Sequence, residues 1–185
     1  MNETIQNILN RRSIRKYSPK QVEENKLKLI LECAQYAPSA QNRQPWHFTM
    51  ITKRSMLDKI TAANRKVMLK SEVERLRERA QQPDFDSFQG APVAILVSGE
   101  DQARYTMSDC ANATENMAIA AQSLGLGCCY LGSFKIAFEA GEAGELLEEL
   151  GVPKGFSPLF ALALGYQDEV LEERAPRREN TITII

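Results

Sequence analysis

The sequence is poor in the residues that build metal centres and disulfide frameworks. Its 185 residues include one histidine, His47, and four cysteines, none of which forms a Cys-x-x-Cys pair. A metal site made of several imidazoles is therefore excluded, and neither a zinc site nor a disulfide framework is indicated. The balance of 23 basic and 24 acidic residues gives no global attraction to nucleic acid or to an anionic membrane, so anions must be recognised by a local patch.

Long apolar runs are missing as well. No run reaches the roughly 18–20 residues that a membrane-spanning helix needs. The first five residues lack the basic and apolar regions of a signal peptide. Because 43% of the residues are hydrophobic, the chain can still build a sizeable core. We expect one cytoplasmic, globular domain over residues 1–185.

Three common catalytic or nucleotide-binding motifs are also absent. No Gly-x-Gly-x-x-Gly opens a helix after a strand, no phosphate-binding P-loop exists, and no Gly-x-Ser-x-Gly turn occurs. His47 lies inside an aromatic strand and is interpreted as a packed residue of that strand. Cys128 and Cys129 are interpreted as small buried hydrophobes rather than a redox pair, because nothing basic adjoins them in the sequence.

Hydrophobic periodicity predicts a mixture of helices and strands. Helices are expected up to residue 10, at 27–34, 55–63, 66–82 and 103–124, and near 146–150; strands are expected at 46–51, 93–97, 128–131 and 159–164. The last five residues, 181–185, have high strand propensity. Left unpaired, such a strand invites aggregation, so we expect it to pair, with another subunit as one candidate.

Two basic clusters stand near the two ends of the chain. The first is Arg11, Arg12, Ser13 and Arg15; closely spaced guanidinium groups with a hydroxyl suit one phosphate. A solvated basic loop or a weak nucleic-acid contact is the alternative. The second cluster is Arg174, Arg177 and Arg178, which alone indicates solvated charge. If the clusters meet, they can close around one phosphate, but the sequence does not show whether they do.

A polar loop with a proline at each end covers residues 38–45. It offers a hydroxyl and three amides beside Trp46. Amide side chains both donate and accept hydrogen bonds, as recognition of the edge of a heteroaromatic ring requires. The alternative is an ordinary connecting loop.

Four motifs resemble those of the flavin-dependent nitroreductase family. Residues 11–17 resemble its N-terminal Arg-x-Ser-x-Arg/Lys-x-aromatic motif, and residues 38–46 resemble its Pro-Ser-x-x-Asn-x-Gln-Pro-Trp signature. Residues 124–134 resemble its helix–strand–loop, and residues 164–166 with 176–178 resemble its closing segment. The four motifs stand in the family's order over nearly the whole chain.

The resemblance implies an α+β, nitroreductase-like fold with a mixed, mainly antiparallel sheet flanked by helices. It implies an obligate homodimer with two FMN sites at the interface and exchange of the C-terminal strands. Residues of about 64–89 would be a variable helical excursion near the substrate cavity.

The resemblance also assigns cofactor-binding residues by position. Arg11 would bind the FMN phosphate with Arg177 or Arg178, Arg12 would contribute mainly its backbone, and Ser13 would bond the phosphate or ribityl chain. Arg15 would lie by the N1–O2 edge of the flavin. The neighbouring subunit would supply Pro38, Ser39, Ala40, Asn42 and Gln44, and the backbone of Leu131, Gly132 and Ser133 would approach N5. Ala40 replaces a second serine often seen in the motif, which removes one hydroxyl.

The activity implied is ping-pong hydride transfer from NAD(P)H through FMN N5 to nitroaromatics, quinones or similar small electron-poor acceptors. No side chain is expected to act as an essential acid or base, since the cofactor carries the redox chemistry. Neither nucleic acid nor membrane is expected as a partner. Two alternatives stay open: a specialised flavoenzyme of the same fold (flavin fragmentation, dehalogenation or azoline oxidation), and a non-enzymatic module that binds phosphate or nucleic acid.

Overall fold

The centre of the molecule is a four-stranded sheet with the strand order β1-β2-β4-β3, in a computed structural model that describes residues 1–185. All three strand pairs are antiparallel. One isolated parallel bridge joins Ser13 to Cys128 at the outer edge of β3. The strands are β1 (Trp46–Ile51), β2 (Val93–Glu100), β3 (Gly127–Leu131) and β4 (Phe156–Gly165).

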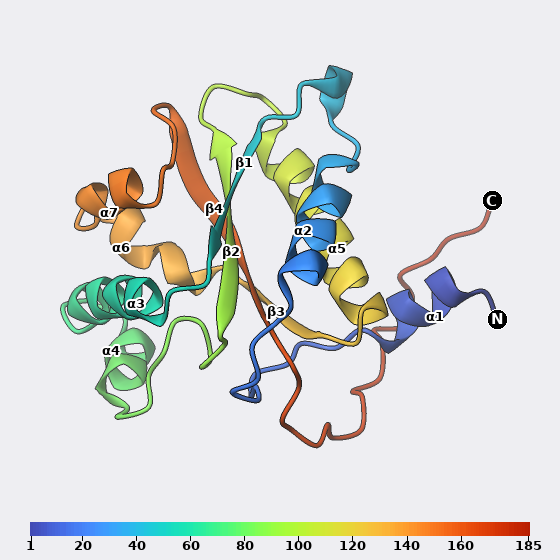
Figure 1. The fold of residues 1–185 in the computed structure, drawn as a ribbon, viewed down its shortest axis with the longest axis horizontal. Coiled ribbons are helices and arrows are strands. Elements are labelled where there is room, and N and C mark those ends of the chain that lie inside the picture. The colour runs from blue at the N-terminus through green and yellow to red at the C-terminus, as the bar shows by residue number, and fades with distance from the viewer.

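Helices cover both faces of this sheet (Figure 1). One face carries α2 (Glu24–Gln35) and α5 (Thr106–Ser123), and the other carries α3 (Arg54–Met68), with α6 (Ile136–Glu139) and α7 (Gly144–Glu149) beside it. The remaining elements are α1 (Glu3–Asn10), α4 (Glu74–Gln81) and two 3-10 turns, η1 (Ala40–Asn42) and η2 (Ser133–Lys135). The predicted α+β class with a mainly antiparallel sheet flanked by helices is confirmed.

Strand β2 is buried on both faces, which explains its unbroken apolar run. Val93, Ile95 and Val97 join the core under α2 and α5. Ala94 and Leu96 join the second core under α3. Because successive strand side chains point to opposite faces, both sets must be apolar when both faces are covered.

Two predicted elements differ from the structure. The helix expected over 66–82 is interrupted, since α3 continues to Met68 and α4 begins only at Glu74. The Arg65 guanidinium donates to the carbonyls of Ala80, Gln82 and Phe85, and these bonds hold the chain after α4 back against α3. Tertiary bonding thus outweighs the continuous helical pattern, which can only report local periodicity.

The strand expected over 181–185 does not form within a single chain. The segment has no strand assignment, and Ile182 and Ile184 are 83% and 93% exposed. Figure 1 shows this tail beside α1, projecting from the body of the molecule. Whether it pairs with a second chain stays a prediction. None of the helices combines the length and the apolarity that crossing a bilayer requires.

A fully buried amide joins the elements on the α3 side of the sheet. Asn64 of α3 has no exposed surface. Its Nδ2 donates to Ser87 Oγ and to the carbonyl of Phe134, and its Oδ1 accepts from the Ala137 N–H at 2.9 Å. This side chain therefore fixes both the approach to β2 and the turn that follows β3.

Replacing this amide should destabilise the protein. We expect Asn64→Ala to lower the free energy of unfolding by about 2–4 kcal/mol, because a buried amide loses its bonds and leaves partners unsatisfied. Thermal denaturation should show a fall of roughly 4–16 °C at this chain length. Gln81→Ala, an exposed change on α4, is the control. An Asn64→Ala protein as stable as this control would contradict the assigned role.

Candidate active site

The basic residues after α1 lie along the edge of the sheet. The Ile14 N–H donates to the Cys128 carbonyl at 2.8 Å, so the segment 11–15 runs beside β3. A Cβ at Gly127 would come within 2.8 Å of the Ile14 side chain, which explains the glycine there. Ile14 is buried, while Arg11 and Arg12 stay partly exposed. The strand edge thus presents the guanidinium groups to solvent.

The C-terminal segment returns to the same corner. Arg174 Nη2 donates to the Arg11 carbonyl, and Arg12 Nη1 donates to the Glu172 carbonyl, both at 3.2 Å. The pKa of Arg174 is lowered by partial burial and by the charges of Arg177, Arg12 and Arg11. We call Arg11, Arg12, Arg174 and Arg177 the arginine cluster.

The arginine cluster carries an excess of positive charge. Its one ion pair joins Arg11 Nε to Glu115 Oε1 at 3.7 Å, and the Glu115 side chain is half exposed. Arg178 forms neither a hydrogen bond nor an ion pair with the cluster, whereas Arg177 lies close enough to depress the pKa of Arg174. A dianionic group would relieve this repulsion, since charge-assisted bonds to guanidinium are among the strongest.

Two neighbouring cavities lie beside the cluster, and Arg12 is the one cluster residue that lines either of them. The cavity of about 480 Å³ is lined by Arg12, Ser13 and residues 168–172. The other, of about 610 Å³, reaches the region 79–90. Arg15, Lys16 and Glu169 line both cavities, and we call the two cavities together the polar groove.

Glu169 shapes the middle of this groove. Its Oε1 accepts hydrogen bonds from the backbone N–H groups of Arg15 and Lys16. The carboxylate is therefore used by the backbone, and neither the Arg15 nor the Lys16 side chain forms an ion pair with it. Sequence reasoning missed Glu169, because no motif marks a residue so distant in the chain.

The polar loop 38–45 has an unusual backbone. Gln41, Asn42 and Gln44 have positive φ values of 56°, 54° and 49°. Such values are uncommon for residues other than glycine and must be held by surrounding contacts. Ser39 Oγ accepts from the Gln44 N–H at 3.0 Å, and Gln44 Nε2 donates to Asn42 Oδ1 at 3.0 Å.

Helix α5 anchors this loop from below. Both carboxylate oxygens of Asp109 lie within 3.3 Å of the Ala40 nitrogen, and Asn112 Nδ2 donates to the Pro38 carbonyl. Asp109 is only 5% exposed. Sequence reasoning missed both residues. The one signal for Asp109 was its place on the helix: it is a carboxylate three residues after Thr106, on a face whose other residues are apolar or small.

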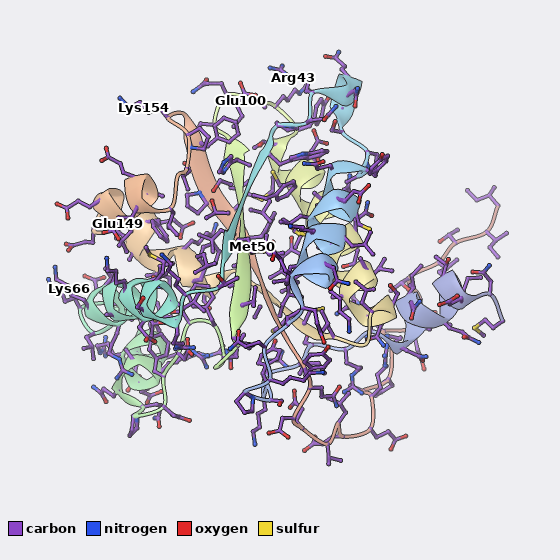
Figure 2. All side chains as sticks on the ribbon, viewed as in Figure 1. Arg43, Met50, Lys66, Glu100, Glu149 and Lys154 are labelled. Atoms are coloured by element: carbon purple, nitrogen blue, oxygen red, sulfur yellow. The ribbon has the colours of Figure 1, made fainter.

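The loop and the arginine cluster lie at opposite ends of the sheet. Trp46, which follows the loop, pairs with Gly99 at one end of β2, and Val93 at the other end pairs with Leu164 beside the cluster. Eight residues of β2 span about 20 Å. Figure 2 shows Arg43 and Glu100 at the loop end, with Met50 near the middle of the sheet. One chain therefore does not bring the predicted site residues together.

The residues expected near N5 follow the end of β3. Leu131 is buried and pairs with Ala161, while Gly132 and Ser133 are exposed. Gly132 has a φ of −107°, and a Cβ there would meet no atom within 4 Å. Neither the backbone nor the packing of this chain requires glycine at position 132, so its open side is free for a ligand.

The cysteine pair and the histidine take no part in this groove. The structure brings Arg11 and Arg15 near the thiols, contrary to the expectation that nothing basic adjoins them. Burial outweighs these charges: it raises the pKa of Cys128 to about 12 and also raises the pKa of Cys129. His47 is half-buried with its ring edge-on to Phe156. No three His, Cys, Asp or Glu side chains gather to hold a metal.

Fold and groove together define the class: an α+β protein with a cluster of arginines at the edge of an antiparallel sheet. The chain belongs to the nitroreductase family, whose model matches residues 8–166. The family resemblance read from the four motifs is therefore confirmed.

Individual relatives are similar over most of their length. A protein of Archaeoglobus fulgidus described as an NADH dehydrogenase/NAD(P)H nitroreductase is 33% identical over 174 residues, with 90% of this chain and 86% of that protein covered. The FMN reductase (NADPH) of Bacillus subtilis is 27% identical over 202 residues, covering 100% and 76%. A crystal structure of a nitroreductase with bound FMN from Bacteroides fragilis superimposes with a TM-score of 0.94 at 33% identity, with 100% of both chains covered.

Loss of the α5 anchor should loosen the loop. We expect Asp109→Ala to speed hydrogen exchange in the peptide containing residues 40–44 at least tenfold, because the Ala40 N–H loses its acceptor and the positive-φ turns lose support. Asp109→Asn, which keeps one acceptor oxygen, should exchange at an intermediate rate. Ser108→Ala, beside it on the exposed face of α5, is the control. Equal exchange in Asp109→Ala and the control would remove Asp109 from this role.

Proposed function

We propose that the protein is an FMN-dependent NAD(P)H oxidoreductase that reduces small electron-poor molecules such as nitroaromatics and quinones. Its class, an NAD(P)H-dependent oxidoreductase with FMN, rests on the family and on relatives named for FMN and for NAD(P)H. What we propose beyond this class is the kind of acceptor and the transfer of hydride through the flavin. The observation that carries it is the arginine cluster, in which both ends of the chain converge with a net positive charge.

The groove suits FMN in charge and in polarity. The phosphate would bind Arg11, Arg174 and the Ser13 hydroxyl, where a dianion offsets the repulsion that lowers the pKa of Arg174. The polar walls of the smaller cavity suit the ribityl hydroxyls. Arg12 donates from its side chain to the Glu172 carbonyl, so its backbone would be the part that contacts the cofactor.

Chain residues orient the ring rather than react with it. When bound, FMN supplies hydride transfer from NAD(P)H to the acceptor. Arg15, in the middle of the groove, would stabilise negative charge at the N1–O2 edge, and the open side of Gly132 would admit the ring near N5. Asp86 and Glu169, the acids lining the larger cavity with Asp84, are already bonded to the chain itself. Asp84 has no such bond, but no essential general acid or base is assigned, because the flavin carries the redox chemistry.

A second copy of the chain would complete the site. Because loop 38–45 lies about 20 Å from the arginine cluster within one chain, its contacts to the same cofactor would have to come from a partner. The exposed Ile182 and Ile184 of the tail and the exposed Ile5, Ile8 and Leu9 of α1 provide apolar surface for such an interface. We therefore propose a homodimer with exchanged C-terminal strands.

The two alternatives predict different products. A specialised flavoenzyme would form a product beyond the reduced acceptor and oxidised nicotinamide, whereas a binding module would neither hold FMN nor oxidise nicotinamide. No observation on this chain favours either over the general reductase, and the family favours an enzyme.

Removing one guanidinium tests the phosphate assignment. We expect Arg11→Ala to weaken FMN binding at least tenfold, about 1.4 kcal/mol, because a charge-assisted bond to the phosphate is lost. Fluorescence titration of the apoprotein with FMN measures the affinity, and Lys28→Ala, a remote charge on α2, is the control. The wild-type protein should be yellow and should bleach on adding NAD(P)H. Unchanged affinity in Arg11→Ala would refute the assignment, and a colourless protein that ignores both FMN and NAD(P)H would refute the function.

A further inference from the structure

The larger cavity of the groove is lined by more free cations than free anions. Its acids are Asp84, Asp86 and Glu169. The carboxylate of Asp86 is bonded to Arg54, to Thr61 and to the N–H groups of Phe88 and Gly90, and that of Glu169 is bonded to backbone N–H groups. Of these three acids, Asp84 is the one whose carboxylate forms no hydrogen bond or ion pair within the chain.

Three basic side chains line the same cavity without an anionic partner. Arg15, Lys16 and Arg79 form no ion pair and no side-chain hydrogen bond. Arg15 belongs to the part of the groove assigned to the flavin. Lys16 and Arg79 are left with no task in the fold or in cofactor binding, and they reach the cavity from segments far apart in the sequence.

Arg79 is held in place by an aromatic ring rather than by an acid. Its guanidinium lies 5.7 Å from the centroid of Phe85, and that of Arg65 lies 5.2 Å from it. Arg65 spends its donors on three backbone carbonyls, which fixes the turn that carries Phe85. Arg79 keeps all its donors free beside the cavity. A guanidinium oriented on a ring with unused donors is well suited to bind a carboxylate or phosphate.

We propose that Arg79 and Lys16 bind an anionic group on the molecule that exchanges electrons with the cofactor, so that the enzyme prefers substrates carrying a carboxylate or phosphate. The inference rests on the proposed function, and it deepens it by naming the substrate class. Polar walls agree with this preference, since Phe85 is the one hydrophobic residue lining the cavity. A cavity built for neutral aromatic acceptors would be mainly apolar.

The anionic group has two sources, the acceptor or the reductant. A carboxylate on the acceptor is probed with benzoate, and benzamide is its neutral match. The 2′-phosphate of the reductant is probed by comparing NADPH with NADH. Either anion would bind Arg79 and Lys16 in the same way. The reductant takes part in reduction of the flavin, whereas the acceptor takes part in its reoxidation.

The experiment measures binding and half-reactions of the flavin-loaded protein. Calorimetry gives the dissociation constants of benzoate and benzamide for the oxidised protein, and stopped-flow absorbance gives the apparent Kd of NADPH and NADH during flavin reduction. The variants are Arg79→Gln, Arg79→Lys and Lys16→Gln. Arg75→Gln, on the same helix but outside the cavity lining, is the control.

We expect Arg79→Gln to raise the dissociation constant of either benzoate or NADPH at least tenfold. The dissociation constant of the matched probe, benzamide or NADH, should change less than twofold. Arg79→Lys should recover part of the loss, and Lys16→Gln should show a smaller loss of the same selectivity. Loss confined to benzoate assigns the site to the acceptor, and loss confined to NADPH assigns it to the reductant. If Arg79→Gln releases flavin, the other two variants carry the same test.

Equal changes for charged and neutral probes, or no change beyond that of Arg75→Gln, would overturn the proposal. Flavin content and reduction by NAD(P)H separate this failure from failure of the proposed function. If the wild-type protein binds FMN and is reduced by NAD(P)H, but Arg79→Gln affects charged and neutral probes alike, only this inference is refuted. If the wild-type protein binds no FMN, the proposed function is refuted as well.

Discussion

The hydrogen bond from Ile14 N–H to the Cys128 carbonyl is the constraint on which the site depends. It fixes the segment 11–15 to the outer edge of β3, where the returning C-terminal segment meets it through Arg174. Without this register the guanidinium groups would be scattered along flexible ends of the chain. Gly127 makes the close approach feasible, because any side chain there would collide with Ile14. One glycine and one backbone bond therefore help to bring two basic stretches to one corner of the molecule.

This arrangement gathers positive charge at one corner of the molecule. The pKa of Arg174 is lowered by burial and by the charges of Arg177, Arg12 and Arg11, while the one carboxylate paired with the cluster is Glu115, on Arg11. A ligand that binds only the folded state stabilises it in proportion to the logarithm of its concentration over Kd. In the proposed function, a phosphorylated cofactor bound at the arginine cluster would offset this repulsion and stabilise the folded chain. Arg15, Lys16 and Arg79, which have no anionic partner, line the neighbouring cavity.

Sequence reasoning found most elements, because long periodic stretches and proline or glycine boundaries are local signals. The strand 46–51 and the helix before Pro38 are examples. It failed at residues 69–73, which interrupt the helix predicted over 66–82, and at the tail, whose strand propensity has no partner within one chain. The family motifs located the arginine cluster and the loop 38–45. They could not reveal Asp109, Glu169 or Arg79, since each acts through contacts between segments far apart in the sequence.

The central claim is that each cofactor site combines the arginine cluster of one chain with the loop 38–45 of another. Differently tagged Arg11→Ala and Ser39→Ala/Asn42→Ala chains can be co-expressed, and the mixed dimer isolated through both tags. Our account predicts one tightly bound FMN per mixed dimer and weak binding in both parent homodimers, because one site of the mixed dimer then holds neither defect. If each site were built within one chain, every site of the mixed dimer would carry a defect. A mixed dimer that binds FMN no better than its parents would contradict the account.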